Sequence, residues 1–220
     1  MAVKLLISSL ANCGKTTLLK SLEDVYVVAH DGKQYPFAQP HTNIDSFQSV
    51  SALIATVNTK LGIYKEKFNK LPAIIAFDSV SKIFESIADN CNRIHKGFEV
   101  WKNVNSEVAE FNRYIEGTLI PNGINVVIVS HAVWNPDVAI YELVAQGSFA
   151  KKGGWLSETD NSIFIEIKNG KRIVHHRSPK FAARTTLEDL PDNQSVEEYN
   201  LQAHINKLTA AKNTAEQYTL

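Results

Sequence analysis

The sequence predicts an α/β fold, in which a parallel sheet core is flanked by helices and extended by antiparallel strands. Short continuous apolar runs alternate with amphipathic segments up to about residue 130, and such runs are typical of parallel strands that are buried on both faces. Beyond that point the runs become shorter. Asn169-Gly170 lies between two of them and predicts a hairpin turn, because both residues accept positive φ angles.

Each element follows from a local pattern. Runs of apolar and β-branched residues predict parallel strands at Val3–Ile7, Val25–Ala29, Ala73–Phe77 and Ile124–Val129. Apolar residues spaced three and four apart predict the helices between them, at Thr17–Leu22, Ser46–Leu61, Val80–Cys91 and Trp101–Leu119. Shorter strands are expected at Ala139–Val144, Ser162–Lys168 and Arg172–His176. A helix is expected at Ser195–Leu208, after which the polar segment Thr209–Leu220 should fray.

The composition indicates one well-buried core. A chain of 220 residues with 44% hydrophobic residues is long enough for such a core and a small appendage. No linker or repeat divides it, so we expect one domain over residues 1–190 and a C-terminal helix and tail over residues 191–220. The 23 Lys and Arg residues balance the 23 Asp and Glu residues, so any contact with nucleic acid requires a local basic patch.

The sequence also indicates in which cellular compartment the protein resides. Cys13 and Cys91 lack the spacing of a zinc site or a disulfide framework, which favours a reducing environment. The apolar run before Cys13 is too short for a secretory signal, and Asn12 does not suit a cleavage site. No run of about 18 apolar residues is present to span a bilayer. We expect a soluble cytoplasmic protein without a membrane partner, in the host cytoplasm if the chain is viral.

One segment matches the phosphate-binding pattern G-x-x-x-x-G-K-[ST], except that Ser9 replaces the first glycine. A predicted strand precedes it and a predicted helix follows it, and the loop N–H groups and the helix dipole both attract phosphate. The alternative is a chance Gly-Lys-Thr at a helix start. We predict that Lys15 binds the β- and γ-phosphates and that the Thr16 hydroxyl binds Mg²⁺. The predicted nucleotide-binding residues are Ser9, Leu10, Ala11, Asn12, Cys13, Gly14, Lys15, Thr16 and Thr17.

Two other apolar runs end in polar residues that are candidates for the same site. Asp78 follows the run Ala73–Phe77, and a carboxylate at such a strand tip is the Walker B pattern, which holds Mg²⁺ directly or through water. His131 follows another run and is a candidate sensor of the γ-phosphate or a residue that positions the attacking water. The alternatives are an aspartate that caps the next helix and an ordinary turn histidine.

These three segments, their order and the helix that contains Trp101 resemble the RecA-like P-loop ATPases encoded by phages. The nearest likeness is to the AAA-type ATP-binding proteins linked to single-strand annealing and recombination. The resemblance covers roughly residues 3–190, and only the P-loop is a specific motif. It implies a RecA-like P-loop NTPase fold, ATP and Mg²⁺ as cofactors, slow hydrolysis, a homo-oligomeric ring or filament, and contact with single-stranded DNA and a single-strand DNA-binding protein.

The resemblance also assigns roles to single residues. The family's acidic residue after the second strand, which polarises the attacking water, falls on Asp31. It is commonly glutamate, so the shorter aspartate implies slow hydrolysis or the use of another carboxylate, such as Glu85 or Asp89. The alternative is an ordinary Asp-Gly turn. Lys180 or Arg184, in the family's basic segment, would reach the γ-phosphate of a neighbouring subunit and contribute about 10³- to 10⁵-fold in rate. The alternative for Arg184 is a surface pair with Glu188.

Residues 146–155 are the candidate contact with single-stranded DNA. Lys151 and Lys152 would bind phosphates, and Phe149 and Trp155 would stack on bases. The segment has roughly the place of the family's DNA-binding loops, and its glycines would make the backbone mobile. The alternative is a surface loop whose aromatic residues dock on the core.

Other functions fit less well. A small P-loop kinase needs an arginine-rich lid, and no arginine cluster precedes Arg172. The residues after Asp78 and after Asn206 do not complete the D-x-x-G and N-K-x-D motifs of a GTPase. A nucleotide-gated DNA-binding or assembly protein with little turnover is the main alternative, because Ser9 and Asp31 both depart from the catalytic pattern. We therefore expect a Mg-dependent ATPase that acts on single-stranded DNA in phage recombination, annealing or replication.

Overall fold

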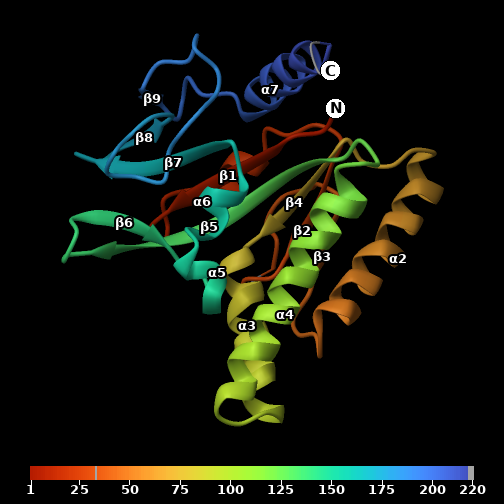
Figure 1. The fold of residues 1–220 in the computed structure, drawn as a ribbon. Coiled ribbons are helices and arrows are strands. Elements are labelled where there is room, and N and C mark those ends of the chain that lie inside the picture. The colour runs from red at the N-terminus through yellow and green to blue at the C-terminus, as the bar shows by residue number, and fades with distance from the viewer. Residues whose placement is uncertain (33, 218–220) are drawn as a thin grey trace.

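The computed structural model describes residues 1–32 and 34–217, which form an α/β fold with one mostly parallel mixed sheet and flanking helices (Figure 1). The strand order is β3-β2-β4-β5-β1-β7-β8-β9, and β6 pairs with β5. The strands are β1 (Lys4–Ser9), β2 (Val25–Ala29), β3 (His41–Asn43), β4 (Ile74–Asp78), β5 (Asn125–Asn135), β6 (Ile140–Leu143), β7 (Asn161–Lys168), β8 (Lys171–His175) and β9 (Asn193–Ser195).

The sheet has a parallel core and antiparallel additions, as predicted. β1 pairs in parallel with β5 and β7, and β2 and β4 continue the parallel part. The pairs β5–β6, β7–β8 and β8–β9 are antiparallel. Asn169 and Gly170 have φ angles of 51° and 74°, so the predicted hairpin turn between β7 and β8 is confirmed.

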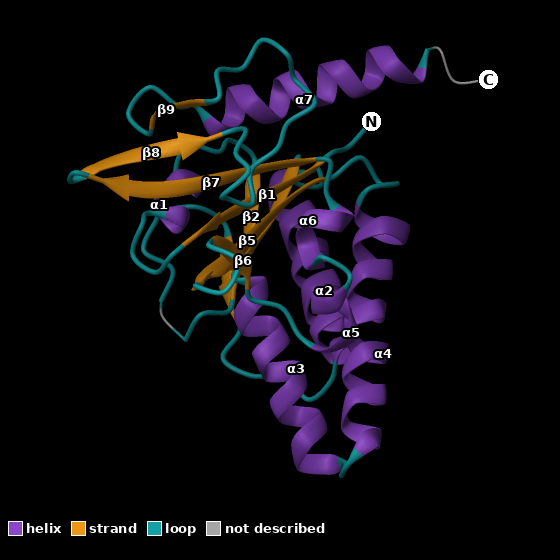
Figure 2. Ribbon diagram, turned by 60° about the vertical axis from the view of Figure 1, so that its left-hand side comes forward, coloured by secondary structure: helices purple, strands orange, loops and turns teal. Residues whose placement is uncertain are grey.

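Helices cover both faces of the sheet (Figure 2). Alternation along β1 explains this, since Leu6 faces one hydrophobic cluster while Leu5 and Ile7 face the other. The first cluster includes α2 (Val50–Phe68), α3 (Val80–Ile94), α4 (Phe98–Tyr114) with the π-helical turn η1 (Ile115–Leu119), α5 (Gly147–Lys151) and α6 (Gly154–Glu158). The second includes α1 (Lys15–Leu19) and α7 (Leu201–Glu216).

Some boundaries differ from the prediction because tertiary contacts extend or move the elements. β5 does not stop at Val129 but continues to Asn135, and its residues from Ala132 onward leave the parallel core and pair with β6. The N-cap of α2 is Ser49, whose hydroxyl accepts the Ala52 N–H at 3.2 Å, so the helix begins later than expected. Strands β3 and β9 were not predicted; each is short and acquires its conformation by pairing with a neighbour.

The C-terminal helix also departs from expectation. Ser195 belongs to β9, and α7 begins only after Asn200, whose side chain accepts the Ala203 N–H at 2.9 Å. The predicted fraying after Thr209 is wrong as far as Glu216. Lys212 Nζ donates to the Ala2 carbonyl at 2.8 Å, so α7 is held beside the N-terminus (Figure 1). Residues 218–220 lie outside the described part of the chain.

Candidate functional site

The predicted phosphate loop joins the end of β1 to the start of α1. Asn12 and Gly14 have φ angles of 61° and 94°, in the left-handed region, and these two residues turn the chain from strand to helix. Gly14 is the N-cap of α1. Because α1 has only five residues, its dipole is short, and the loop N–H groups and the Lys15 ammonium are the other sources of attraction for an anion.

The side chain of Lys15 is folded back over this loop. Its Nζ donates to Ser9 Oγ at 2.9 Å, to the Leu10 carbonyl at 2.9 Å and to the Ser9 carbonyl at 3.3 Å, and the residue is only 7% exposed. Burial lowers the pKa of Lys15, while electrostatic interactions with Cys13 and Asp78 act in the opposite direction. Ser9, which replaces the first glycine of the motif, is therefore a direct hydrogen-bond partner of Lys15.

Thr16 and Asp78, the predicted Mg²⁺ residues, are in contact. The Thr16 hydroxyl donates to Asp78 Oδ2 at 2.6 Å, although the two residues are 62 positions apart in the chain. Asp78 is the last residue of β4 and is 5% exposed. Burial raises the pKa of Asp78, and Asp31 raises it further, whereas Thr16 and Lys15 lower it. Burial at this strand tip removes water from the Asp78 carboxylate and so disfavours its charged form, while the hydrogen bond from Thr16 and the charge of Lys15 favour it.

The contact suits a magnesium ion with a nucleotide. In the described residues there is no group of three or more His, Cys, Asp or Glu side chains placed to hold a metal. A nucleotide-bound Mg²⁺ does not require one, because it is usually held by one or two protein oxygens, substrate phosphates and waters. The Thr16 hydroxyl and the Asp78 carboxylate are oxygens of the required kind.

Asp31 and His131 lie at the same edge of the sheet. Ser9 is opposite His131 in the β1–β5 pairing, and Ala29 is opposite Asp78 in the β2–β4 pairing. Asp31 is close enough to raise the pKa values of both Asp78 and His131. Burial is the largest effect on His131 and lowers its pKa, so its imidazole is neutral at pH 7. His131 is a residue within β5, at the end of the parallel pairing, and is not a turn residue.

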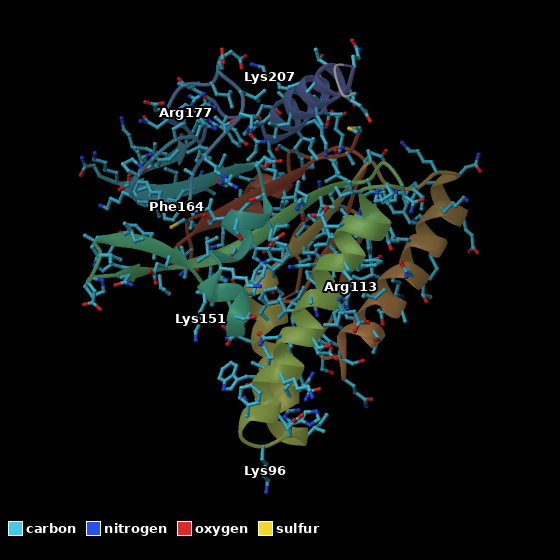
Figure 3. All side chains as sticks on the ribbon, viewed as in Figure 1. Lys96, Arg113, Lys151, Phe164, Arg177 and Lys207 are labelled. Atoms are coloured by element: carbon cyan, nitrogen blue, oxygen red, sulfur yellow. The ribbon has the colours of Figure 1, made fainter. Side chains whose placement is uncertain are left out.

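The predicted DNA-stacking role of Phe149 and Trp155 is wrong for this structure. They are 8% and 1% exposed, and both rings pack against Phe84, at centroid distances of 5.4 and 5.7 Å. The alternative expected from the sequence, aromatic residues docked on the core, is the one observed. Lys151 and Lys152 remain exposed, and Figure 3 shows Lys151 directed outward from α5.

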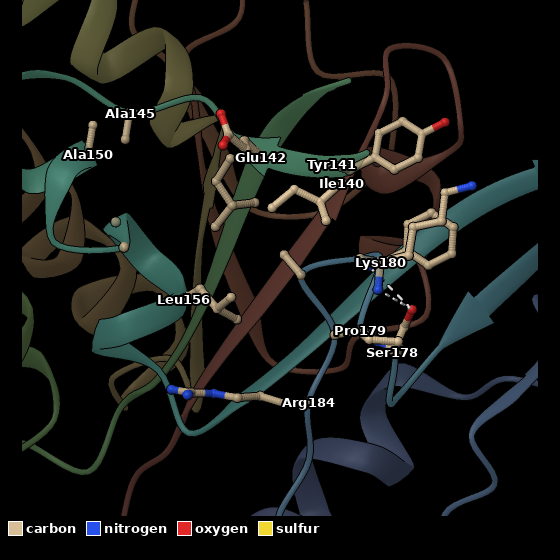
Figure 4. Close-up of a pocket in the computed structure, with 16 residues that line it drawn as sticks. Ile140, Tyr141, Glu142, Ala145, Ala150, Leu156, Ser178, Pro179, Lys180 and Arg184 are labelled. Atoms are coloured by element: carbon tan, nitrogen blue, oxygen red, sulfur yellow. Dashed lines mark hydrogen bonds between the residues drawn. The ribbon is translucent and has the colours of Figure 1, made fainter. Parts of the chain in front are cut away.

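Arg184 lies away from the loop edge of its own chain. Its guanidinium donates to the Thr159 carbonyl through Nε at 3.1 Å and through Nη2, and its backbone pairs with Ser162, which is level with Leu6 rather than Ser9. Together with Glu142 and Lys180 it lines a cavity of about 550 Å³ between β6, α6 and residues 178–184 (Figure 4). Action on a neighbouring subunit stays a prediction.

Three residues of this region were not singled out from the sequence. Ser81 Oγ accepts the His131 N–H at 2.8 Å, and His30 N–H donates to the Asp78 carbonyl at 2.6 Å. Both residues are near neighbours of predicted site residues, which was the available signal. Arg172, on β8, places Nη1 2.9 Å from the point where a Cβ on Gly14 would lie. Nothing local in the sequence indicates this proximity, which depends on β8 lying two strands from β1.

Comparisons with known proteins identify no relative. No model of a known protein family matches the chain, and comparison with curated proteins gives no match. Within the described residues, the helices include none that combines the length and apolar character needed to cross a bilayer. Function must therefore be argued from the geometry.

Proposed function

We propose that this protein binds ATP with Mg²⁺ at the Ser9–Thr16 loop and hydrolyses it. The observation that carries the proposal is the 2.6 Å hydrogen bond from Thr16 to Asp78 beside the buried ammonium of Lys15. A phosphate loop, a lysine, a hydroxyl and a strand-tip carboxylate in this arrangement are the parts that phosphoryl transfer requires. Two segments that are far apart in the sequence, the Ser9–Thr16 loop and Asp78, thus meet at one edge of the sheet.

Each residue has a role that follows from its position. Lys15 exchanges the Ser9 and Leu10 oxygens for the β- and γ-phosphate oxygens, where its charge stabilises the transition state. Thr16 and Asp78 hold Mg²⁺, which when bound neutralises charge on the same phosphates. Asp31 accepts a hydrogen bond from the attacking water and orients it in line, and neutral His131 lies on the same side, where the γ-phosphate would be.

We further propose that the ATPase acts on single-stranded DNA as a homo-oligomer in the cytoplasm, in recombination, annealing or replication. Support comes from the resemblance to phage RecA-like ATPases and from the exposed Lys151 and Lys152, which are available for phosphate contacts. Base stacking by Phe149 and Trp155 is no longer part of this proposal, because both rings are in the core.

A second candidate is a nucleotide-gated binding or assembly protein with little turnover. It is favoured by the three acceptors that hold Lys15 in the loop, one of which is the hydroxyl of Ser9. A nucleotide must displace these contacts before Lys15 can bind phosphate. Slow turnover would follow if Lys15 returned easily to these acceptors, because the γ-phosphate would then lack the charge that stabilises the transition state.

The test is phosphate release from ATP, with and without single-stranded DNA. We expect DNA-stimulated turnover in the native chain and in Lys20→Ala, a control that removes an exposed lysine just after α1. Lys15→Ala and Asp78→Asn should abolish it. Equal turnover in the native chain and Lys15→Ala would exclude the site. ATP binding without turnover would support the gated module, and phosphate transfer to a nucleotide acceptor would identify a kinase.

A further inference from the structure

An arginine from the β7–β8 hairpin lies over the candidate phosphate loop. Arg172 Nη1 is 2.9 Å, and its Cδ 3.8 Å, from the position that a Cβ would take on Gly14. The Cβ of Thr17 is 3.9 Å from the same point. The arginine therefore adjoins the end of the loop at which α1 begins, and a Cβ on Gly14 would require its guanidinium to shift.

The strand order indicates which end of a nucleotide would meet this arginine. In the order β4-β5-β1-β7-β8, the Thr16–Asp78 contact and His131 lie toward β4 and β5. Those groups suit the metal and the γ-phosphate. Because the phosphates form a linear chain across the loop, the nucleoside end must lie on the other side of β1, toward β7 and β8. Arg172 is on that side.

The ion pair that holds the Arg172 guanidinium is weak enough for a phosphate to replace Glu197 as its partner. Nη2 of Arg172 is 3.6 Å from Oε1 of Glu197, and the two side chains are 38% and 64% exposed. Exposed ion pairs of this kind are weak, whereas a phosphate can take a guanidinium through two parallel hydrogen bonds. The backbone is fixed by the pairing of Arg172 with Ile167 and by the Val196 N–H, which donates to the Arg172 carbonyl at 3.0 Å. Only the side chain has to move.

We propose that Arg172 binds the α-phosphate of the nucleotide and that Glu197 competes with the nucleotide for this arginine. The inference rests on the proposed function to the extent that the loop must bind a nucleotide. It adds a residue that contributes to affinity for any nucleotide with an α-phosphate, whatever the state of the γ-phosphate. Its effect is thus separable from that of Lys15.

The test compares the affinities of Mg-ATP, Mg-ADP and adenosine, measured by calorimetry. We expect Arg172→Met to weaken ATP and ADP by the same factor, about tenfold for a lost charge-assisted contact, and to leave adenosine unchanged. Lys171→Met is the matched control. Lys171 is exposed, next to Arg172 on the same strand, and on the opposite face of it, so its removal should change none of the three affinities.

Glu197→Gln is the second variant, and it keeps Arg172 in place. It should tighten ATP and ADP by about twofold, the factor expected if the pair occupies the arginine half of the time. Unchanged affinities in Arg172→Met would overturn the inference. If Arg172→Met weakened only the affinity for ATP, Arg172 would lie at the γ-phosphate and the inference would be overturned. If it also weakened the affinity for adenosine, Arg172 would lie at the nucleoside, which would overturn the inference as well. If the native chain binds neither ATP nor ADP, the proposed function itself fails.

Discussion

The hydroxyl of Thr16 donates to Asp78 Oδ2 at 2.6 Å and joins the first turn of α1 to the tip of β4. This contact crosses β5, because the strand order places β5 between β4 and β1. It brings a hydroxyl and a carboxylate together at the edge where the loop opens.

Thr16→Val should impair the use of magnesium. The change removes the hydroxyl that we assign to the metal but keeps the size of the side chain, so ATP turnover should fall by about 100-fold, comparable to the loss of one transition-state contact. The magnesium concentration needed for half-maximal turnover should rise. Thr59→Val, which removes an exposed hydroxyl on α2, should leave both quantities unchanged. A variant with native magnesium dependence would show that Thr16 is not a ligand.

Ser9→Gly should strengthen nucleotide binding. It completes the motif and removes the Oγ that accepts from Lys15 at 2.9 Å, so less has to be displaced when phosphate binds. We expect ATP affinity to increase by about threefold to tenfold, the range for one hydrogen bond. Ser9→Ala removes the same hydroxyl without adding backbone freedom and should give a similar gain. Weaker ATP binding in both variants would mean that the Ser9 hydroxyl contacts the nucleotide, in addition to holding Lys15 in the absence of nucleotide.

Gly14→Ala should weaken nucleotide binding by about 5- to 30-fold. Gly14 has φ = 94°, and an added Cβ would lie 2.9 Å from Arg172 Nη1. The left-handed backbone alone costs a residue with a Cβ about 1–2 kcal/mol. Removal of the obstruction in Gly14→Ala with Arg172→Ala should therefore not restore binding. The control is Gly62→Ala in α2, where nothing lies within 4 Å, which should raise the free energy of unfolding by about 0.4–1 kcal/mol.

Trp155→Ala should affect stability before it affects DNA binding. The indole is 1% exposed and contacts Phe84, Phe111 and Phe149, so its loss should reduce the free energy of unfolding by about 3–5 kcal/mol. Urea denaturation measures this. Trp134→Ala, which removes a ring that is 43% exposed, should cost much less. Full stability of Trp155→Ala, together with lost DNA binding, would restore the stacking role.

Acid should destabilise the packing of α7 on the sheet. His176 and His204 are 0% and 3% exposed, and burial lowers their pKa values to about 4 and about 3. Arg177 also lowers the first, and Lys207 lowers the second against an opposing effect of Asp189. Because the unfolded histidines bind protons more readily, stability is complete above about pH 6.5 and declines as the pH falls toward 4.

Substitution of one buried histidine measures its share of the pH dependence. Chemical denaturation between pH 7 and pH 5 should show a loss of about 1–2 kcal/mol for each buried histidine. His176→Leu should remove its share, and the slope of stability against pH should become shallower. His41→Gln, at an exposed position, should leave the slope as it is. An unchanged slope in His176→Leu would show that acid acts elsewhere.

Much of the sheet could be predicted because apolar runs and turn residues are local features of the sequence. The bounds of β2 agree with the expected Val25–Ala29, and the hairpin at Asn169 and Gly170 follows from the φ angles that those residues accept. The loop residues and Asp78 could be named for the same reason. The contact between Thr16 and Asp78 supports that choice, while nucleotide binding stays a prediction.

The sequence by itself determined the parallel core formed by β1, β2, β4 and β5 and the hairpin of β7 and β8, since periodicity and turn chemistry depend on near neighbours. Only the tertiary structure decided that Trp155 belongs to the core, that β5 continues past His131, and that Arg172 lies over Gly14. Each of these depends on packing or pairing between segments far apart in the chain. An aromatic ring or an arginine has the same local pattern whether it faces solvent, the core or a phosphate.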